Sequence, residues 1–340
     1  GIATNFKICL YHPDEQPTPS PSQSPSESYV KPDDTLFAIG ENQNSQIDSS
    51  KHDDHLYSEP TIVNNSGDEI LQFEVHDTGN LMLKNDGSLW SSGNILKTNE
   101  DPKYHKTMGS WVGDFYKIDD GIEYIRASNG AVYFKRVNDD KLYARPVSNH
   151  SYAQSAIGLE NSGSSPEYPQ VVINDDDLPL ENVVQISIAH KLTVFRTSDG
   201  KVYGAGQDEV QWNVFGLDGI PKTKATLLAT GDLEGNTISA VIANNGVLVL
   251  QDTGKLYRVG LVSQYARNLF PEKTSPPNSS TLVQNTFFNF TDNVTKIFEG
   301  GLLEKEDKCL YAPDLNRAGS YNGRQVGLGI LYKVQNTEGN

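Results

Sequence analysis

A few polar clusters in this 340-residue chain have residue types and spacings that could bind a metal ion. His52 and His55 lie three residues apart in a polar stretch, and imidazole nitrogens are common zinc ligands. Asn174 precedes the run Asp175-Asp176-Asp177, whose side-chain oxygens are of the type that Ca²⁺ prefers. Neither cluster has a distant ligand that completes a site, and runs of like charge are typical of solvated loops. The sequence therefore predicts no bound metal.

The candidates for catalysis are a glycine-rich segment and one histidine. Gly204-Ala205-Gly206-Gln207 begins like a dinucleotide-binding loop, but it lacks the third glycine and does not open a helix. His190 could act as a base, yet its place in a sequence repeat favours a side chain that bonds the backbone of a neighbouring unit. No Ser/His/Asp or Cys/His arrangement stands out. We expect a protein without catalytic residues and without a cofactor.

Five Asn-x-Ser/Thr triplets are acceptors for N-linked glycans. They begin at Asn64, Asn149, Asn278, Asn289 and Asn293. A chain this rich in Asn, Ser and Thr gains about four such triplets by chance, so their positions matter more than their number. All but Asn293 fall in predicted loops, which favours a glycoprotein of the secretory pathway or the extracellular space. A cytoplasmic protein is the alternative.

The chain has two cysteines, Cys9 and Cys309, and each immediately precedes Leu-Tyr. Two interpretations are open. A disulfide would clasp the two ends of the chain and suit a secreted protein, whereas two buried thiols need no oxidising compartment. If the residues lie in adjacent sheets at equal radius, their Cα atoms exceed the separation of about 7 Å that a disulfide permits.

The charge balance excludes some partners. Asp and Glu number 44 against 28 Lys and Arg, giving a formal charge of -16 that opposes binding to nucleic acid. No stretch of about 18 apolar residues occurs, so we expect no membrane span. The first residues, Gly1 to Asn5, lack the layout of a signal peptide, and we expect that a leader is absent or has been removed.

A dipeptide of an aliphatic and an aromatic residue recurs just after a polar turn, and it organises the whole chain. The copies are Leu36-Phe37, Leu89-Trp90, Leu142-Tyr143, Val202-Tyr203, Leu256-Tyr257 and Leu310-Tyr311. From aromatic to aromatic the intervals are 53, 53, 60, 54 and 54 residues. Together with many Gly and Pro, this period predicts an all-β fold in which each unit is one blade of a β-propeller.

Each repeat is expected to hold four strands. The dipeptide strand forms a hairpin with a strand upstream, because Asp-Gly or a close substitute allows the positive φ angles of a tight primed turn. The upstream strands are Asn80–Lys84, Ala131–Arg136, Lys191–Arg196, Gly246–Leu250 and a weaker Gly301–Leu303. A further strand precedes the hairpin at Leu71–Val75, Phe115–Ile118, Val183–Ile188 and Val294–Phe298. Polar stretches such as 148–166 and 206–213 are long enough for an outer strand.

The chain is expected to divide at residue 28. Residues 1–28 hold an early strand, Phe6–Tyr11, and a Pro/Ser-rich loop, and residues 29–340 form the propeller domain. We expect the early strand to pair with Leu328–Val334, so that both termini build the closing blade. The residues beyond Tyr311 and before Phe37 hold one full interval or two compressed ones. The prediction is therefore six or seven four-stranded blades.

One repeat is specific enough to suggest a family. Val183 to Gln207 has a Val-x-x-Ile strand, a small residue, His190, an apolar strand, Asp-Gly and Val-Tyr-x-x-Gly, and it resembles a repeat of the regulator of chromosome condensation family. The resemblance covers residues 29–335, in which the other repeats are degenerate. It implies a propeller that binds other proteins or, in a minority of members, exchanges nucleotide on a small GTPase.

The expected function is that of a non-catalytic scaffold that engages a protein partner through its loops. A carbohydrate-binding protein is the first alternative, because Asp77–Leu83 with Ser88–Gly93 resembles a single repeat of a bulb-type lectin. Guanine-nucleotide exchange on a small GTPase is the second. The sequence contains no recognisable protruding element for that exchange.

Overall fold

The computed structural model describes residues 7–9, 37–41, 56–62, 70–76, 79–93, 115–127, 131–146, 170–189, 192–206, 214–217, 222–243, 246–263, 281–307 and 309–311. Within these ranges the regular structure is β-strand, apart from the short 3₁₀ turn η3 over Glu299–Gly301. The all-β class expected from the sequence is confirmed. In the described ranges we find no helix with the length and apolar character needed to span a membrane.

Five four-stranded antiparallel sheets follow one another along the chain, and we call them blades 1 to 5. Blade 1 contains β4 (Ile70–His76), β5 (Gly79–Lys84), β6 (Leu89–Gly93) and β7 (Tyr116–Asp119). Blade 2 contains β8 (Ile122–Ala127), β9 (Ala131–Arg136), β10 (Asp139–Pro146) and β11 (Gln170–Val171). Blade 3 contains β12 (Val183–Ala189), β13 (Leu192–Thr197), β14 (Val202–Gly206) and β15 (Lys222–Leu227).

The last two blades complete the series. Blade 4 contains β16 (Thr237–Ala243), β17 (Gly246–Gln251), β18 (Leu256–Ser263) and β19 (Thr281–Thr291). Blade 5 contains β20 (Val294–Ile297), β21 (Leu303–Lys305), β22 (Cys309–Tyr311) and β1 (Lys7–Cys9). A separate pair, β2 (Phe37–Glu41) and β3 (Leu56–Ile62), carries the first copy of the dipeptide.

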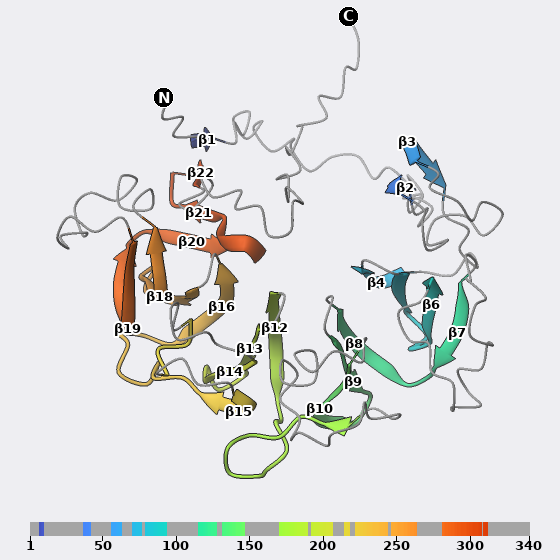
Figure 1. Cartoon of the computed structure of the whole chain (residues 1–340), viewed down its shortest axis with the longest axis horizontal. Coiled ribbons are helices and arrows are strands. Elements are labelled where there is room, and N and C mark those ends of the chain that lie inside the picture. The colour runs from blue at the N-terminus through green and yellow to red at the C-terminus, as the bar shows by residue number, and fades with distance from the viewer. Residues whose placement is uncertain are drawn as a thin grey trace, which may run out of the picture.

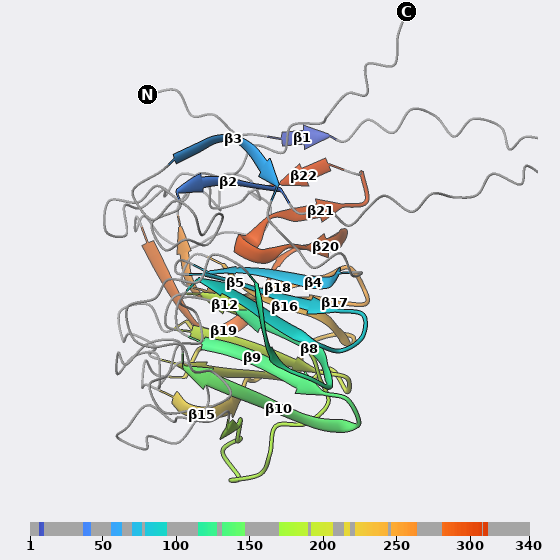
Figure 2. The same ribbon diagram turned by 90° about the vertical axis from the view of Figure 1, so that its right-hand side faces the viewer.

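The blades lie around a common centre in chain order, with the first strand of each blade nearest to it (Figure 1). Seen from the side, the strands run in roughly one direction, so that their ends gather on two opposite faces (Figure 2). This is the arrangement of a β-propeller, as the sequence predicts.

The hydrophobic core consists of layers between consecutive blades. Four clusters of buried side chains fill the spaces between blades 1 and 2, 2 and 3, 3 and 4, and 4 and 5. Between blades 2 and 3, the rings of Tyr133 and Phe195 meet edge to face with centroids 5.4 Å apart. Because both faces of a blade are covered, its central strands are apolar on both sides, and each fully buried side chain of this kind stabilises the fold by about 1.5–3 kcal/mol.

The hairpin turns lie where the sequence predicts them, but their type differs. In blade 1 the turn closes with a bond from the Gly87 N–H to the Lys84 carbonyl at 2.9 Å, and Gly87 has φ +80°. Gly200 and Gly254 repeat this geometry, whereas blade 2 turns through two residues, Val137 and Asn138, between the paired Arg136 and Asp139, and Asn138 has φ +63°. A primed two-residue turn needs positive φ at its first central residue, and type I′ needs it at both. The turns of blades 1, 3 and 4 have three residues, and each of the four turns has one left-handed residue, so one Gly or Asn is sufficient.

Two strand assignments from the sequence are corrected. Phe115–Ile118 was expected to begin a repeat, but β7 is the outer strand of blade 1, and the first strand of blade 2 is β8. A tight connection at Asp120 and Gly121 separates the two strands, and composition does not reveal which side of it an apolar run occupies. The weaker strand Gly301–Leu303 begins only at Leu303, because Gly301 belongs to η3.

The N-terminal strand joins the last blade, where β22 is its partner among the described residues. β1 pairs with β22 in antiparallel register, Lys7 opposite Tyr311 and Cys9 opposite Cys309. The expected partner Leu328–Val334 lies outside the described residues. In the described residues β1 is therefore the fourth strand of blade 5, next to β22.

Candidate functional site

One end of the blades combines tight turns with exposed side chains, and we call it the turn face. The turn between the second and third strands of each blade lies at this end, and the first strand of the blade begins beside it. Ile70, the first residue of β4, opposes Lys84 at the turn of blade 1, and Val183, the first residue of β12, opposes Thr197 at the turn of blade 3. The face lies on the right-hand side of Figure 2. It comprises residues 85–88, 119–123, 137–141, 172–184, 198–201, 227–238, 252–255, 292–296 and 304–307, together with Leu71.

Six large hydrophobic side chains are exposed on the turn face. These are Leu71, Val137, Leu178, Val184, Leu227 and Ile238, which keep between 46% and 58% of their accessible surface. Single exposed hydrophobic residues are ordinary, whereas several on one face are typical of an interaction site.

Three of these residues occupy the same position in their repeats. Leu71, Val184 and Ile238 are second in β4, β12 and β16, where the register shifts against the neighbouring strand. Such a β-bulge inserts an unpaired residue and turns its side chain away from the ladder. The bulge therefore exposes an aliphatic side chain near the centre of the propeller in blades 1, 3 and 4.

Acidic side chains dominate the turns around these residues. They include Asp86, Asp119, Asp120, Glu123, Asp139, Asp140, Asp175, Asp176, Asp177, Glu181, Asp199, Asp232, Glu234, Asp252, Glu306 and Asp307. Hydrogen bonds from Ser88 lower the pKa of Asp86, and hydrogen bonds from Asn236 lower that of Asp252. The face is therefore negatively charged at neutral pH.

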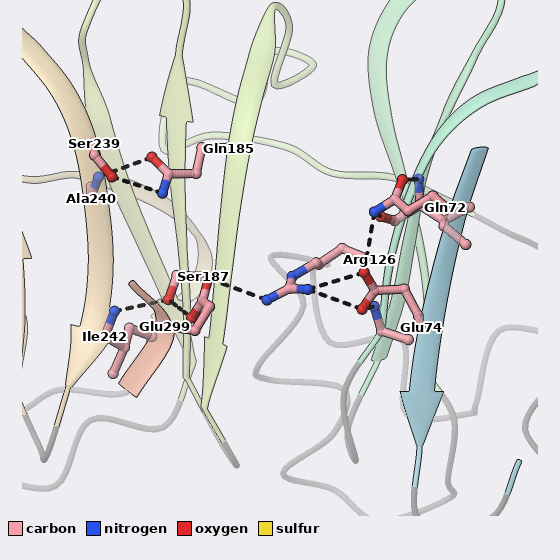
Figure 3. A network of polar contacts seen from close by, with 11 residues as sticks. Gln72, Glu74, Arg126, Gln185, Ser187, Ser239, Ala240, Ile242 and Glu299 are labelled. Carbon is pink, nitrogen blue, oxygen red and sulfur yellow. Dashed lines mark hydrogen bonds and ion pairs between the residues drawn. The ribbon is translucent and has the colours of Figure 1, made fainter. Parts of the chain in front are cut away.

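Beneath the turn face, glutamine side chains bond the backbone of the following blade (Figure 3). The Gln72 amide donates to the Ile125 carbonyl at 2.5 Å and accepts from the Ile125 N–H at 3.1 Å. Gln185, at the equivalent position of blade 3, accepts from the Ala240 N–H at 3.0 Å and donates to Ser239 Oγ at 3.0 Å. One repeat position therefore holds neighbouring first strands together.

Arg126 ties together three blades in the same region (Figure 3). Its guanidinium donates to the two carboxylate oxygens of Glu74 at 3.0 and 3.1 Å and lies 3.2 Å from Oε1 of Glu299 in η3. Ser187 donates to Glu299 at 2.7 Å and accepts from the Ile242 N–H at 2.9 Å. The cluster joins the first strands of blades 1 to 4 to η3 of blade 5.

The charges in this cluster act on one another. Burial acts to lower the pKa of Arg126, but the carboxylates of Glu74 and Glu299 outweigh it and the pKa is raised. Burial raises the pKa of Glu299 against the hydrogen bond from Ser187 and the charge of Arg126. Each polar group already has a partner within the cluster, which is typical of a structural tie and gives no nucleophile or base directed at solvent.

No family model matches this chain, and no curated protein matches it in sequence. Among solved structures, human WBSCR16 is similar over 80% of this chain and 73% of its own, with 16% identity and a TM-score of 0.58. Yeast RCC1 (Prp20) bound to Kap60 is similar over 81% of this chain, with 17% identity and a TM-score of 0.58. Prp20p from Saccharomyces cerevisiae, whose structure was reported with its binding properties to Gsp1p and histones, is similar over 78%, with 14% identity and a TM-score of 0.52.

The fold is that of an RCC1-type β-propeller. The chain spans 65% and 63% of the two yeast chains. The resemblance to the regulator of chromosome condensation family, seen in the sequence from Val183 to Gln207, is confirmed at the level of the fold by these structural neighbours. His190, which belongs to that motif, lies outside the described residues.

The structure places two of the five glycan acceptors of this RCC1-type propeller. Asn293 is exposed in the turn before β20 with φ +60°, and Asn289 is partly buried in β19, where its Nδ2 donates to Asp292 at 2.9 Å. Asn64, Asn149 and Asn278 lie outside the described residues. Glycosylation at each acceptor stays a prediction.

The acidic run Asp175-Asp176-Asp177, which precedes blade 3, makes hydrogen bonds and an ion pair with neighbouring residues of the chain. Asn174 Oδ1 accepts from the N–H groups of Asp176 and Leu178, Asp177 pairs with Lys224, and Asp175 accepts from Thr226. Within the described ranges no group of three potential metal ligands comes together. His52 and His55 lie outside those ranges, and the absence of a metal stays a prediction.

The segment that resembles a lectin repeat turns its polar side chains inward. Asn80 is buried and donates to the buried Ser92 at 3.1 Å, and the Trp90 indole N–H donates to Ser88 at 2.8 Å. Gly204 and Gly206 likewise lie within β14, a strand of the RCC1-type propeller. Neither segment forms an open loop in the described structure.

The two cysteines lie closer together in the fold than the sequence suggests. The condition of adjacent sheets is not met, because Cys9 and Cys309 are opposite each other in neighbouring strands of blade 5. The radius argument therefore does not apply, since the separation across one strand pair is much shorter than that between blades.

Sequence reasoning missed the exposed aliphatic residues of the turn face and the Arg126 cluster. A signal for the first exists, because the strict alternation of β-strands is interrupted at Ile70-Leu71-Gln72, Val183-Val184-Gln185 and Thr237-Ile238-Ser239. In each segment two β-branched or aliphatic residues stand side by side before a Gln or Ser. This pattern recurs at the same point of three repeats and indicates a bulge. No sequence signal indicates the Arg126 cluster, since Glu299 is 173 residues away along the chain.

Proposed function

We propose that this chain is a non-catalytic scaffold that binds a protein partner on its turn face. One observation carries the proposal: six large hydrophobic side chains are exposed on that face. Exposed apolar side chains framed by polar turns are typical of surfaces that bind proteins.

The solved relatives support a protein-binding role. Yeast RCC1 (Prp20) was solved in complex with Kap60, and Prp20p was reported with its binding properties to Gsp1p and histones. Propellers of this type therefore serve as surfaces for other proteins. The glycan acceptors add support for a secreted or cell-surface location, and a loss of mass after treatment of the native protein with peptide-N-glycosidase tests that location.

The partner is sought by affinity purification from the native source with three forms of the protein. The first is the wild type, and the second is Leu71→Gln with Val184→Gln and Ile238→Gln. The third, a control for the same face, is Ser198→Ala with Ala229→Ser, two exposed positions on its turns. Circular dichroism and thermal unfolding establish that all three are folded.

We expect a stoichiometric partner on the wild type and on the control, and its loss from the apolar variant. Equal retention by all three forms would contradict the turn face as the site, and an inert monomer without a partner would contradict the scaffold. We expect no binding on a glycan array and no nucleotide release in assays with a panel of small GTPases. Binding or release in either assay would replace the scaffold with the lectin or the exchange factor.

A further inference from the structure

We infer that the turn face binds a positively charged polypeptide segment that also carries apolar side chains. This inference rests on the proposed function and adds the chemistry of the partner. Two features of the face, its aliphatic centre and its acidic periphery, lead to it.

The aliphatic centre comes from the first strands. Leu71, Val184 and Ile238 are exposed at the bulges of β4, β12 and β16, the strands nearest the centre of the propeller (Figure 1). Val184 and Ile238 belong to adjoining blades, whose next residues, Gln185 and Ser239, are hydrogen-bonded at 3.0 Å. A partner that covers these side chains removes apolar surface from water, which favours binding. A partner that makes ionic contacts alone would leave this surface exposed to water.

The acidic periphery comes from the turns between second and third strands and from the connections between blades. Adjacent strands are about 4.8 Å apart, so these turns lie one to two strand widths further out than the aliphatic centre. Most cations at this end are already engaged with neighbouring carboxylates. The pairs are Lys117–Asp120, Lys135–Glu123, Arg136–Asp119, Lys201–Asp199, Lys224–Asp177 and Lys255–Glu234.

The pairing leaves an excess of negative charge. Asp140, Asp175, Asp176, Glu181, Asp232 and Glu306 are exposed carboxylates on the same face beyond those pairs. A field of one sign raises the association rate of an oppositely charged partner and opposes a partner of the same sign. Nucleic acid, acidic proteins and anionic lipid surfaces are therefore disfavoured, and a segment with Lys or Arg beside aliphatic or aromatic residues fits both features.

The test uses three synthetic peptides of about 20 residues, a length that can cross such a face, with a fluorescent label at one end. The first alternates Lys and Leu clusters, the second has Ser in place of Leu at the same charge, and the third has Glu in place of Lys. Fluorescence anisotropy measures each peptide against the wild type, the apolar variant and the control variant. A charge variant, Asp140→Asn with Asp176→Asn and Asp232→Asn, changes exposed carboxylates that form no part of the blade ties.

We expect the Lys/Leu peptide to bind at least about tenfold tighter than either of the others, and binding to weaken as salt rises through about 0.15 M. The apolar variant should bind the Lys/Leu and Lys/Ser peptides alike, and the charge variant should lose about fivefold for both. Equal binding of the Glu/Leu peptide, or binding that salt and the charge variant leave unchanged, would overturn the inference.

The failure of this inference is distinguishable from that of the proposed function. If the native partner is lost from the apolar variant but is indifferent to salt and to the charge variant, the turn face is the site and the partner is not basic. If the native partner is retained by both variants, the site itself is misplaced and both statements fall.

A second inference rests on the backbone register of blade 5 alone. Cys9 and Cys309 are directly opposite in the antiparallel pair β1 and β22. Opposite residues in such a pair have Cα atoms about 4.5 or 5.5 Å apart, and both values lie within the 4.4–6.8 Å range of disulfides. The register points to a disulfide that fastens the N-terminal strand to the last blade, where the described ladder joins three residue pairs.

The bond forms when the two thiols each lose a proton and together give two electrons to a disulfide oxidant such as oxidised glutathione, which leaves as two thiols. Peptide mapping of the wild type without reductant, after equilibration with oxidised glutathione, should find residues 9 and 309 in one cross-linked species that reductant separates. Cys9→Ser should abolish that species. Full alkylation of both cysteines in the equilibrated wild type would overturn this inference.

Discussion

The guanidinium of Arg126 in blade 2 lies 3.2 Å from the carboxylate of Glu299, which comes from blade 5. Between them in the chain stand blades 3 and 4. A contact between blades so far apart in sequence exists only when the blades are gathered around a centre, and it reports on that arrangement.

Replacing Arg126 with Met should destabilise the fold by about 3 kcal/mol, because the side chain of Glu74 is 8% exposed and loses the partner of its buried charge. Urea unfolding measures the change. Lys201→Met is the matched control, since the Lys201–Asp199 pair is 55% and 53% exposed and its loss should cost at most about 1 kcal/mol. Equal losses in the two variants would show that the Arg126 cluster is not a buried tie.

Stability should depend on pH through Glu299. Burial raises the folded-state pKa of this carboxyl above 4.5, so the folded state holds the proton more tightly than the unfolded state. Its contribution is complete below about pH 4.5 and is lost as the pH rises through the folded-state pKa. The side chain is 41% exposed, so the effect is small.

Glu299→Gln removes this titration and therefore gains stability relative to the wild type as the pH rises from 4 to 7. Unfolding curves of both proteins at several pH values measure the difference, in which all other titrating groups cancel. A constant difference, or one of the opposite slope, would contradict the raised pKa.

Gln185→Leu should cost about 1–3 kcal/mol, because it leaves the buried N–H of Ala240 without its acceptor. Gln185→Glu keeps an acceptor for that N–H and loses only the donor to Ser239, so its loss should be smaller. Urea unfolding and hydrogen exchange at the Ala240 amide measure both effects. Identical exchange of the Ala240 amide in the wild type and in the Leu variant would contradict the hydrogen bond to Gln185.

Two adjacent glycines in η3 separate backbone strain from steric contact. Gly300 has φ +77° and no atom within 4 Å of an added Cβ, so Gly300→Ala should cost about 1 kcal/mol of left-handed strain. Gly301 has φ +89°, and its added Cβ would lie 2.5 Å from Cβ of Ala243, so Gly301→Ala should cost about 1–3 kcal/mol more. Thermal unfolding of the two variants gives the comparison, and equal melting temperatures would contradict the contact.

Much of the fold follows from local sequence. The strands β5, β6, β9, β10, β13, β14, β17 and β18 lie where the recurring aliphatic–aromatic dipeptide and its upstream partner predict them. The turn at Gly200 and the apolar run of β13 are decided by residues within a few positions of each other. Local steric and hydrogen-bonding preferences act over such distances, and the repeat multiplies them.

The candidate site could be predicted only in part. The acidic excess of the chain is visible in composition, but the gathering of acidic turns on one face depends on which strand ends lie together. The exposure of Val184 depends on a bulge, and in the sequence this residue is indistinguishable from the buried Val183 before it.

The sequence by itself determined the repeat, its strands and its turns, because these depend on interactions between residues close together along the chain. Only the tertiary structure decided that Phe115–Ile118 closes blade 1, that β1 pairs with β22, and that Arg126 meets Glu299. Each of these contacts joins segments whose separation along the chain says nothing about their distance in space. Packing of blade against blade sets that distance, since it decides which edges and side chains meet.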